Sequence, residues 1–287
     1  MFKSVRDAFF DYTVNKEGFT PYLYADTLNL VTTGVGNLVD AGPNFSGNTS
    51  VERARLNNIV SAAAMAPALS LPWKMKGAGW KPTADGITTN GDASRQNVID
   101  AWTAVKQQNQ FVPDFSQRGG GAYQNLTPLT LTMQDMRDLF NRTLNDFDSK
   151  LSVHFPGYES FPADAQFALL SMAWAMGPNF NFPQLKSALD KRDFQSAIPL
   201  SFFKGGGGTP DKPTGRNADN QIMFATAATV ERLGADSSQL YFPGTSSSVR
   251  APIIANAAAL IRMAETSGAI LATAGLGYGV YRWWSKR

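Results

Sequence analysis

The sequence has no cysteine and a single histidine, His154, among its 287 residues. Without thiols the chain can form no disulfide, no thiolate-ligated zinc site and no cysteine nucleophile. One histidine makes a Ser-His-Asp triad or a His-rich metal centre an unfavourable interpretation. Its position beside Phe155 and Pro156 is more typical of a helix end or a surface residue. Chemistry must therefore rest on carboxylates, hydroxyls and amines.

A strong charge of one sign is also lacking. The 26 Lys and Arg residues against 23 Asp and Glu residues give a formal net charge of +3, and hydrophobic residues make up 43%. This composition predicts a globular chain. No run of Lys or Arg resembles that of a nucleic-acid binder, so we expect no nucleic-acid partner. The small positive excess suits approach to an anionic polymer.

The N-terminal segment has no continuous apolar run, because Lys3, Arg6, Asp7 and Asp11 interrupt it. It is therefore not predicted to be a cleavable signal peptide, and export would need another route.

The opposite end of the chain is uncharged from 266 to 281 and ends in aromatic residues beside cations. That pairing is typical of a membrane interface, although sixteen residues are fewer than the roughly 20 of a comfortable span. We predict that 246–287 is an apolar helical tail that contacts a membrane through 266–287. A small-residue helix packed on the domain is the alternative.

Apolar periodicity predicts mainly helices, with one small antiparallel hairpin or three-stranded sheet between residues 22 and 38. The fold class is therefore α+β, predominantly α. We expect a domain over 1–245 that carries an irregular, glycine-rich insertion at 41–130. The helices are expected at 2–16, 51–68, 94–108, 132–153, 162–176, 182–191, 193–200 and 217–233.

Two acids and a threonine surround the predicted hairpin. Glu17 ends the first helix, Asp26 follows after eight residues, and Thr32 follows after five more, just before Gly34 and Gly36. Glycoside hydrolysis needs a proton donor on one side of the scissile bond and a carboxylate near the anomeric carbon. Acid pairs are common on solvated surfaces, and an aspartate in a turn often has only a structural role.

The neighbours of each acid suggest different roles. Phe10, Phe19 and Tyr22 could desolvate Glu17, which would keep its proton available for donation. Asp26 is in a polar turn, where we expect it to stay ionised, and the Thr32 hydroxyl could position a water.

The joint pattern resembles the active-site signature of the phage-type lysozymes, glycoside hydrolase family 24. The spacing Glu-x8-Asp-x5-Thr matches without a gap, as do Glu-Gly, Asp-Thr, the tyrosine two before the aspartate and the Gly-x-Gly of the hairpin. Residues 131–141, 165–177 and 216–234 are similar to helices of that family. The sequence departs from the family at Asn37, where histidine is frequent, and at Ala175, where an amide helps to bind sugar in some relatives.

The resemblance implies a lysozyme-like two-lobed fold, with a β-hairpin lobe, a helical lobe and the cleft between them. It implies that Glu17 is the general acid and that Asp26 and Thr32 hold the attacking water, with no metal or organic cofactor. Trp174 could stack on a sugar, although core packing explains it slightly better. The predicted substrate-binding residues are Tyr24, Gly34, Gly36, Trp174 and Arg216.

The implied activity is an N-acetylmuramidase acting on bacterial peptidoglycan. A lytic transglycosylase and a non-catalytic wall-binding or structural module are the alternatives. With the tail, the resemblance suggests a virion or bacterial-envelope lysin, placed among virion proteins or acting in host lysis.

Overall fold

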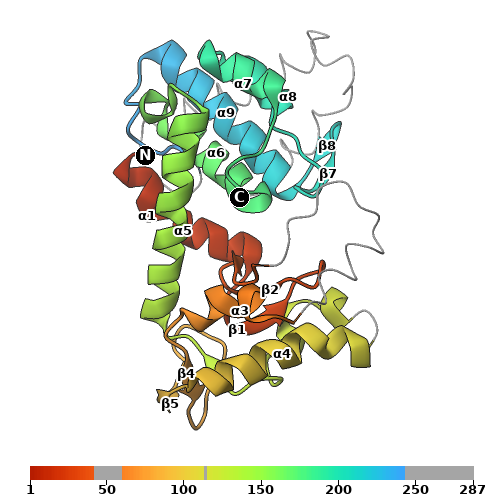
Figure 1. Ribbon diagram of the computed structural model, residues 1–287. Coiled ribbons are helices and arrows are strands. Elements are labelled where there is room, and N and C mark those ends of the chain that lie inside the picture. Colours follow the sequence, from red (N-terminus) through yellow and green to blue (C-terminus); the bar gives the residue numbers. More distant parts are fainter. Residues whose placement is uncertain (42–59, 113–114, 243–287) are drawn as a thin grey trace. The chain divides into compact units, whose positions relative to one another are not determined.

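The structure is a computed structural model that describes residues 1–41, 60–112 and 115–242 (Figure 1). The predicted class, α+β and predominantly α with small antiparallel sheets, is confirmed. The helices are α1 (Lys3–Glu17), α3 (Ala62–Leu69), α4 (Arg95–Phe111), α5 (Met133–His154), α6 (Ala163–Met176), α7 (Pro183–Asp190), α8 (Phe194–Leu200) and α9 (Gly215–Leu233), with short 3-10 helices η1 (Phe115–Arg118), η2 (Gly120–Tyr123) and η3 (Tyr158–Ser160). The strands are β1 (Thr20–Ala25), β2 (Val31–Gly34), β3 (Asn37–Leu38), β4 (Lys74–Lys76), β5 (Thr89–Asp92), β6 (Leu129–Thr130), β7 (Gly208–Thr209) and β8 (Lys212–Pro213).

The chain divides into two compact units. Residues 17–143 form the hairpin unit, and residues 1–16 together with 144–242 form the described part of the helical unit. The chain passes from one unit to the other at the end of α1 and again within α5.

The hairpin unit is built on two three-stranded antiparallel sheets. The first has the strand order β1-β2-β3, with Tyr24 opposite Thr32 and an irregularity in β1 between Thr20 and Tyr24. The second has the order β5-β4-β6. Helix α4 packs against β1 and β2, and its buried residues Val98, Trp102 and Val105 recur at helical spacing. The described parts of the segment 41–130 therefore belong to the same packed unit as the hairpin.

The helical unit is organised around α6, which packs along α9 (Figure 1). Every residue of α6 from Ala163 to Ala173 is buried, as expected from the almost wholly apolar stretch 167–176 of this helix. Edge-to-face contacts of Phe167 with Phe9 and Tyr12 join α1 to this core. Aromatic pairs of this geometry add stability beyond the area that they bury.

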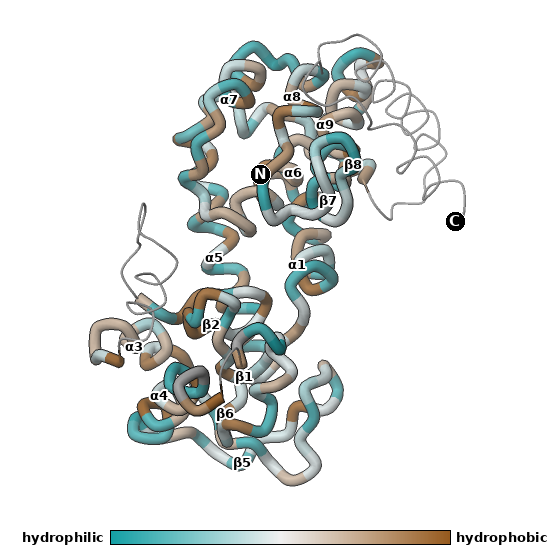
Figure 2. The backbone as a smooth tube through the Cα atoms, turned by 90° about the vertical axis from the view of Figure 1, so that its right-hand side faces the viewer, coloured by the Kyte–Doolittle hydropathy of each residue, from teal (hydrophilic) through white to brown (hydrophobic). Residues whose placement is uncertain are grey.

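Local signals explain where several helices begin. The Thr132 hydroxyl accepts a hydrogen bond from the Asp135 amide (3.1 Å), and the Asp135 carboxylate accepts one from the Thr132 amide (3.1 Å). This reciprocal pair opens α5 at the start expected for the helix over 132–153. Along α5 the tube in Figure 2 alternates between hydrophilic and hydrophobic colours, consistent with an amphipathic helix. Ser94 and Asn97 form the equivalent box before α4.

One expectation for the insertion was wrong. The stretch expected to be loops contributes β5, which pairs with β4, because backbone pairing there does not depend on alternating apolar side chains. The expected helix over 51–68 falls partly outside the described residues.

The predicted tail, 246–287, lies wholly outside the described residues. Within the described ranges, no helix combines the length and apolarity that a membrane crossing needs.

Candidate functional site

Glu17 is the last residue of α1, where its side chain is exposed. Gly36 of the hairpin packs directly against it: a methyl group on Gly36 would lie 3.1 Å from Cγ of Glu17. Glycine is needed at this position, both for its φ of +73° and for the close approach. The Gly-Val-Gly turn therefore packs against the side-chain carbons of the predicted general acid.

Asn37 fixes this turn. Its side-chain oxygen accepts a hydrogen bond from the Val35 amide (3.2 Å), and its amide nitrogen donates to the Thr143 hydroxyl of α5 (3.0 Å). A Cβ on Gly34 would come within 2.8 Å of that same asparagine oxygen. Asn37, the departure from the family pattern, thus has a structural role of its own.

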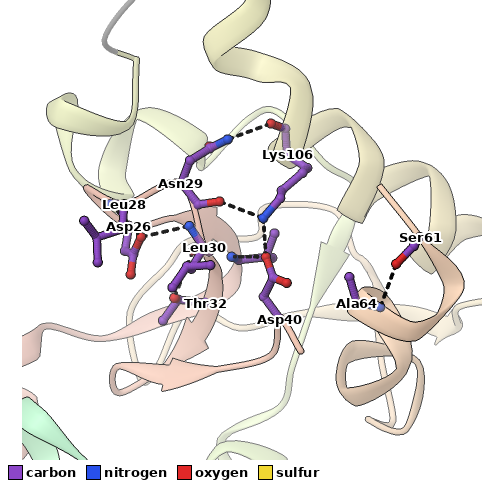
Figure 3. Close-up of polar contacts among 10 residues, drawn as sticks. Asp26, Leu28, Asn29, Leu30, Thr32, Asp40, Ser61, Ala64 and Lys106 are labelled. Atoms are coloured by element: carbon purple, nitrogen blue, oxygen red, sulfur yellow. Dashed lines mark hydrogen bonds and ion pairs between the residues drawn. The ribbon is translucent and has the colours of Figure 1, made fainter. Parts of the chain in front are cut away.

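Asp26 begins the turn between β1 and β2. Its Oδ1 accepts hydrogen bonds from the amides of Leu28 (2.8 Å) and Leu30 (2.9 Å), which fold the turn around the carboxylate (Figure 3). Both bonds go to Oδ1, and among the described residues no hydrogen bond engages Oδ2. One carboxylate oxygen therefore holds the backbone, and the other is available for a water.

Tyr24 lies within electrostatic reach of both acids. Burial raises its pKa well above the ordinary value, and the charges of Glu17 and Asp26 raise this pKa further. Since Coulombic influence falls with distance, both carboxylates lie near this one tyrosine. The structure therefore brings Glu17, Tyr24, Asp26, Gly34 and Gly36 into one neighbourhood of the hairpin unit.

The desolvation expected for Glu17 is found at Asp26 instead. Glu17 is exposed, whereas Asp26 is half-buried, and burial raises its pKa despite the two amide hydrogen bonds and the positive charge of Lys106. The prediction that neighbouring aromatic rings desolvate Glu17 was wrong, because Glu17 is exposed and the Tyr22 hydroxyl donates to the Gly120 carbonyl (3.2 Å).

Thr32 lies opposite Tyr24 in the hairpin and is almost fully buried. Directly paired residues of an antiparallel ladder project on the same face of the sheet, so the two side chains are neighbours. The Thr32 hydroxyl donates to the Leu30 carbonyl (3.2 Å), and its oxygen keeps the capacity to accept.

A buried ion pair behind the Asp26 turn was missed by the sequence analysis. Lys106 of α4 pairs with Asp40, and its ammonium also donates to the Asn29 carbonyl (2.9 Å), as Figure 3 shows. A lysine on the same apolar face as Trp102 and Val105 was the available signal, since such a residue must find an internal partner.

The other two predicted substrate-binding residues belong to the helical unit. Trp174 makes edge contacts with Phe9 (5.6 Å between ring centroids) and Phe147 (5.5 Å), which favours the core-packing interpretation. Arg216 is only 7% exposed and donates to the carbonyl and hydroxyl oxygens of Ser171, both at 3.4 Å. Their roles in substrate binding stay predictions.

His154 ends α5 and contacts the rings of Phe155 and Phe180, in agreement with the helix-end interpretation. Among the described residues, no group of three or more His, Cys, Asp or Glu side chains is arranged to hold a metal ion.

No protein-family model matches the chain, and no curated protein matches it significantly.

Proposed function

We propose that this protein is a peptidoglycan hydrolase, an N-acetylmuramidase of the phage-type lysozyme kind. The observation that carries the proposal is the packing of Gly36 on the stem of Glu17, with Tyr24 within electrostatic reach of Glu17 and Asp26. Two acids and a Gly-x-Gly turn that are separate in sequence thus share one neighbourhood. Paired carboxyl groups are what glycoside hydrolysis requires.

In the proposed reaction, Glu17 donates its proton to the glycosidic oxygen as the bond to the anomeric carbon breaks. A water held by Oδ2 of Asp26 and the oxygen of Thr32 attacks that carbon. Asp26 takes one proton of this water. The leaving sugar has then gained the Glu17 proton, the anomeric carbon has gained a hydroxyl group, and one proton has moved in net from Glu17 to Asp26. This is general acid–base catalysis by positioned side chains.

The environment of Asp26 suits a base. Burial raises the pKa of its carboxyl group, while the amides of Leu28 and Leu30 and the Lys106 charge oppose that rise. A carboxylate with a raised pKa accepts a proton more readily than an ordinary one, and catalytic efficiency improves as the pKa approaches the working pH.

The test is digestion of purified peptidoglycan by the wild-type protein, Glu17→Gln and Glu159→Gln. The glutamine keeps the size of Glu17 but cannot donate the proton, so we expect a loss of about 10²–10⁴-fold. Glu159 is an exposed glutamate of the helical unit, and its variant should keep wild-type activity. Equal activity of Glu17→Gln and wild type would contradict the mechanism.

Mass spectrometry of the same digests separates the alternatives. Reducing N-acetylmuramic acid ends support hydrolysis by water, whereas anhydro ends would identify a lytic transglycosylase. Binding of the glycan without any turnover would identify a wall-binding module.

For the biological setting, we propose a virion or bacterial-envelope lysin whose substrate is host peptidoglycan and whose tail contacts a membrane. The basic, aromatic end of the sequence and its uncharged stretch at 266–281 support membrane contact. Deletion of 252–287 should release the protein from the membrane fraction. An unchanged distribution on flotation would contradict the anchor.

A further inference from the structure

Three contacts tie helix α4 to the chain between Asp26 and Thr32. The Lys106 ammonium donates to the Asn29 carbonyl (2.9 Å), and the Asn29 side-chain amide donates to the Lys106 carbonyl (3.1 Å). Lys106 also pairs with Asp40, whose Oδ2 accepts a hydrogen bond from the Val31 amide (3.2 Å).

These contacts are buried. The side chains of Lys106 and Asp40 are 1% and 0% exposed. A buried ion pair holds its geometry firmly, because moving one partner leaves the other charge uncompensated. Asn29 has a positive φ of 60°, so the turn between the two predicted water-binding groups is both tight and fastened at its centre.

The titratable groups that interact electrostatically with Asp26 come from four segments. Lys106 on α4 lowers its pKa, and Asp40 after β3 raises it, with the lysine acting more strongly than the aspartate. The Asp26 charge raises the pKa of two tyrosines, Tyr24 on β1 and Tyr123 on η2. The Glu17 charge also raises the pKa of Tyr24. Both tyrosines are buried or half-buried, and burial together with the Asp26 charge raises the pKa of Tyr123 to about 12. Both phenols therefore stay neutral while Asp26 titrates, and Lys106 is the cation that lowers its pKa among the described residues.

We propose that Lys106 is a positioning residue: helix α4 of the insertion supplies the buried cation that fixes the Asp26–Thr32 turn. The inference rests on the proposed function. It gives the insertion a role in the reaction, because Lys106 acts through Asp26 and does not touch substrate. The resemblance to lysozymes leaves this segment unexplained.

The test compares Lys106→Met with Lys74→Met. Lys74 is also paired with an aspartate, Asp92, in the same unit, and it is not among the charges that act on Asp26. The titration of the Asp26 carboxyl carbon is followed by NMR in protein labelled with carbon-13 aspartate and is assigned by its absence in Asp26→Asn. The acid limb of kcat/KM against pH is measured on peptidoglycan.

In Lys106→Met we expect the Asp26 midpoint and the acid limb to move together to higher pH, so that activity falls more at acidic than at neutral pH. Lys74→Met should move neither. A second variant, Asn29→Gly, keeps the positive φ and the lysine charge but removes the amide contact to Lys106. We expect it to lower kcat several-fold without moving the midpoint.

An unmoved Asp26 midpoint in folded Lys106→Met would overturn the proposal, as would an equal loss of activity at every pH. If Lys106→Met does not fold, the paired variant Lys106→Met/Asp40→Asn removes both charges. Because the lysine acts more strongly on Asp26, the midpoint should still rise, by less. A wild-type protein that fails to cleave peptidoglycan would refute the proposed function, whereas the NMR midpoint would still report on Lys106 separately.

Discussion

Asp164 in the helical unit and Asp26 in the hairpin unit use their carboxylates in different ways. In the helical unit, Asp164 is fully buried, and its two oxygens accept hydrogen bonds from the amides of Phe242 (2.7 Å) and Tyr241 (3.2 Å). In the hairpin unit, Asp26 is half-buried and commits only Oδ1 to the backbone. Both oxygens of Asp164 therefore accept hydrogen bonds from the backbone, whereas Oδ2 of Asp26 remains available to bind a water.

Asp219 of the helical unit is half-buried like Asp26, but it forms an ion pair. Asp219 pairs with Lys16 (2.5 Å) and accepts from the Tyr12 hydroxyl (3.2 Å), with the Arg216 charge nearby. These charges are balanced inside the unit. Two amides stabilise the half-buried Asp26 carboxylate, and within the described residues no cation pairs with it directly. Such a carboxylate is costly to folding, so its presence favours function over stability at this turn.

The largest expected effect is the loss of activity in Asp26→Asn. In Asp26→Asn the amide oxygen can still accept from Leu28 and Leu30, so the turn should persist while the base is lost. We expect peptidoglycan hydrolysis to fall by about 10²–10⁴-fold with near-native circular dichroism. Asp236→Asn is the matched control, because Asp236 caps an equivalent turn by accepting from the Ser238 amide (2.9 Å) in the helical unit. Comparable losses in both variants would contradict a special role for Asp26.

At Asp164 the expected change is in stability. Asp164→Ala leaves two buried amides without acceptors, which should lower the free energy of unfolding by about 2–4 kcal/mol. Denaturant unfolding measures this loss, and activity per folded molecule should be unchanged. Asp193 is exposed and also accepts two hydrogen bonds, from the Ser196 amide and hydroxyl. Asp193→Ala should lose only about 1 kcal/mol, as for an ordinary helix cap. Equal losses would mean that burial does not decide the cost.

Two glycines with positive φ, one in each unit, differ in what surrounds them. Gly36→Ala and Gly234→Ala each place a side chain in the left-handed region, at φ values of 73° and 61°, and each should lose about 1–2 kcal/mol of stability. Only the methyl group at Gly36 would press on Glu17, since nothing lies within 4 Å of one at Gly234. We expect kcat to fall about tenfold or more in Gly36→Ala alone, because small displacements of a catalytic group are costly. Equal kcat values in the two variants would argue against the Glu17–Gly36 contact.

The fold was predictable where local chemistry decides it. The first helix, the hairpin and α5 follow from apolar periodicity, glycines at turns and the Thr132–Asp135 box, each set by neighbours in sequence. The pairing of β4 with β5 and β6 was not predictable, because these short strands carry no alternating apolar pattern and are held by backbone bonds.

The site was predictable to the same degree. The spacing of Glu17, Asp26 and Thr32 is evident in the sequence, and the resemblance supplied their roles. The assignment of desolvation was wrong because it assumed that sequence neighbours are spatial neighbours. Lys106 and Asp40 are 66 residues apart, and a lysine in a helix is usually solvated, so only the tertiary structure could join them.

The smallest expected effect concerns stability against pH at the same aspartate. Burial raises the pKa of Asp26 above its ordinary value of 3.8, so the proton is held more tightly in the folded state. The stability that this proton contributes is present below the ordinary pKa and is lost as pH rises through the folded pKa. An asparagine in place of Asp26 does not titrate and carries no such penalty. The melting temperature of Asp26→Asn should therefore exceed that of wild type at pH 7, and the difference should vanish in acid.

For Asp236 the sign reverses, because the hydrogen bonds from Ser238 lower the pKa of its carboxyl group. The stability that this carboxylate contributes is present above the ordinary pKa and is lost as pH falls through the folded pKa. Asp236→Asn should therefore be less stable than wild type at pH 7. Melting curves of wild type and the two variants between pH 3 and 7 test both signs. A destabilised Asp26→Asn at neutral pH would show that burial of the Asp26 carboxylate is not costly to the fold.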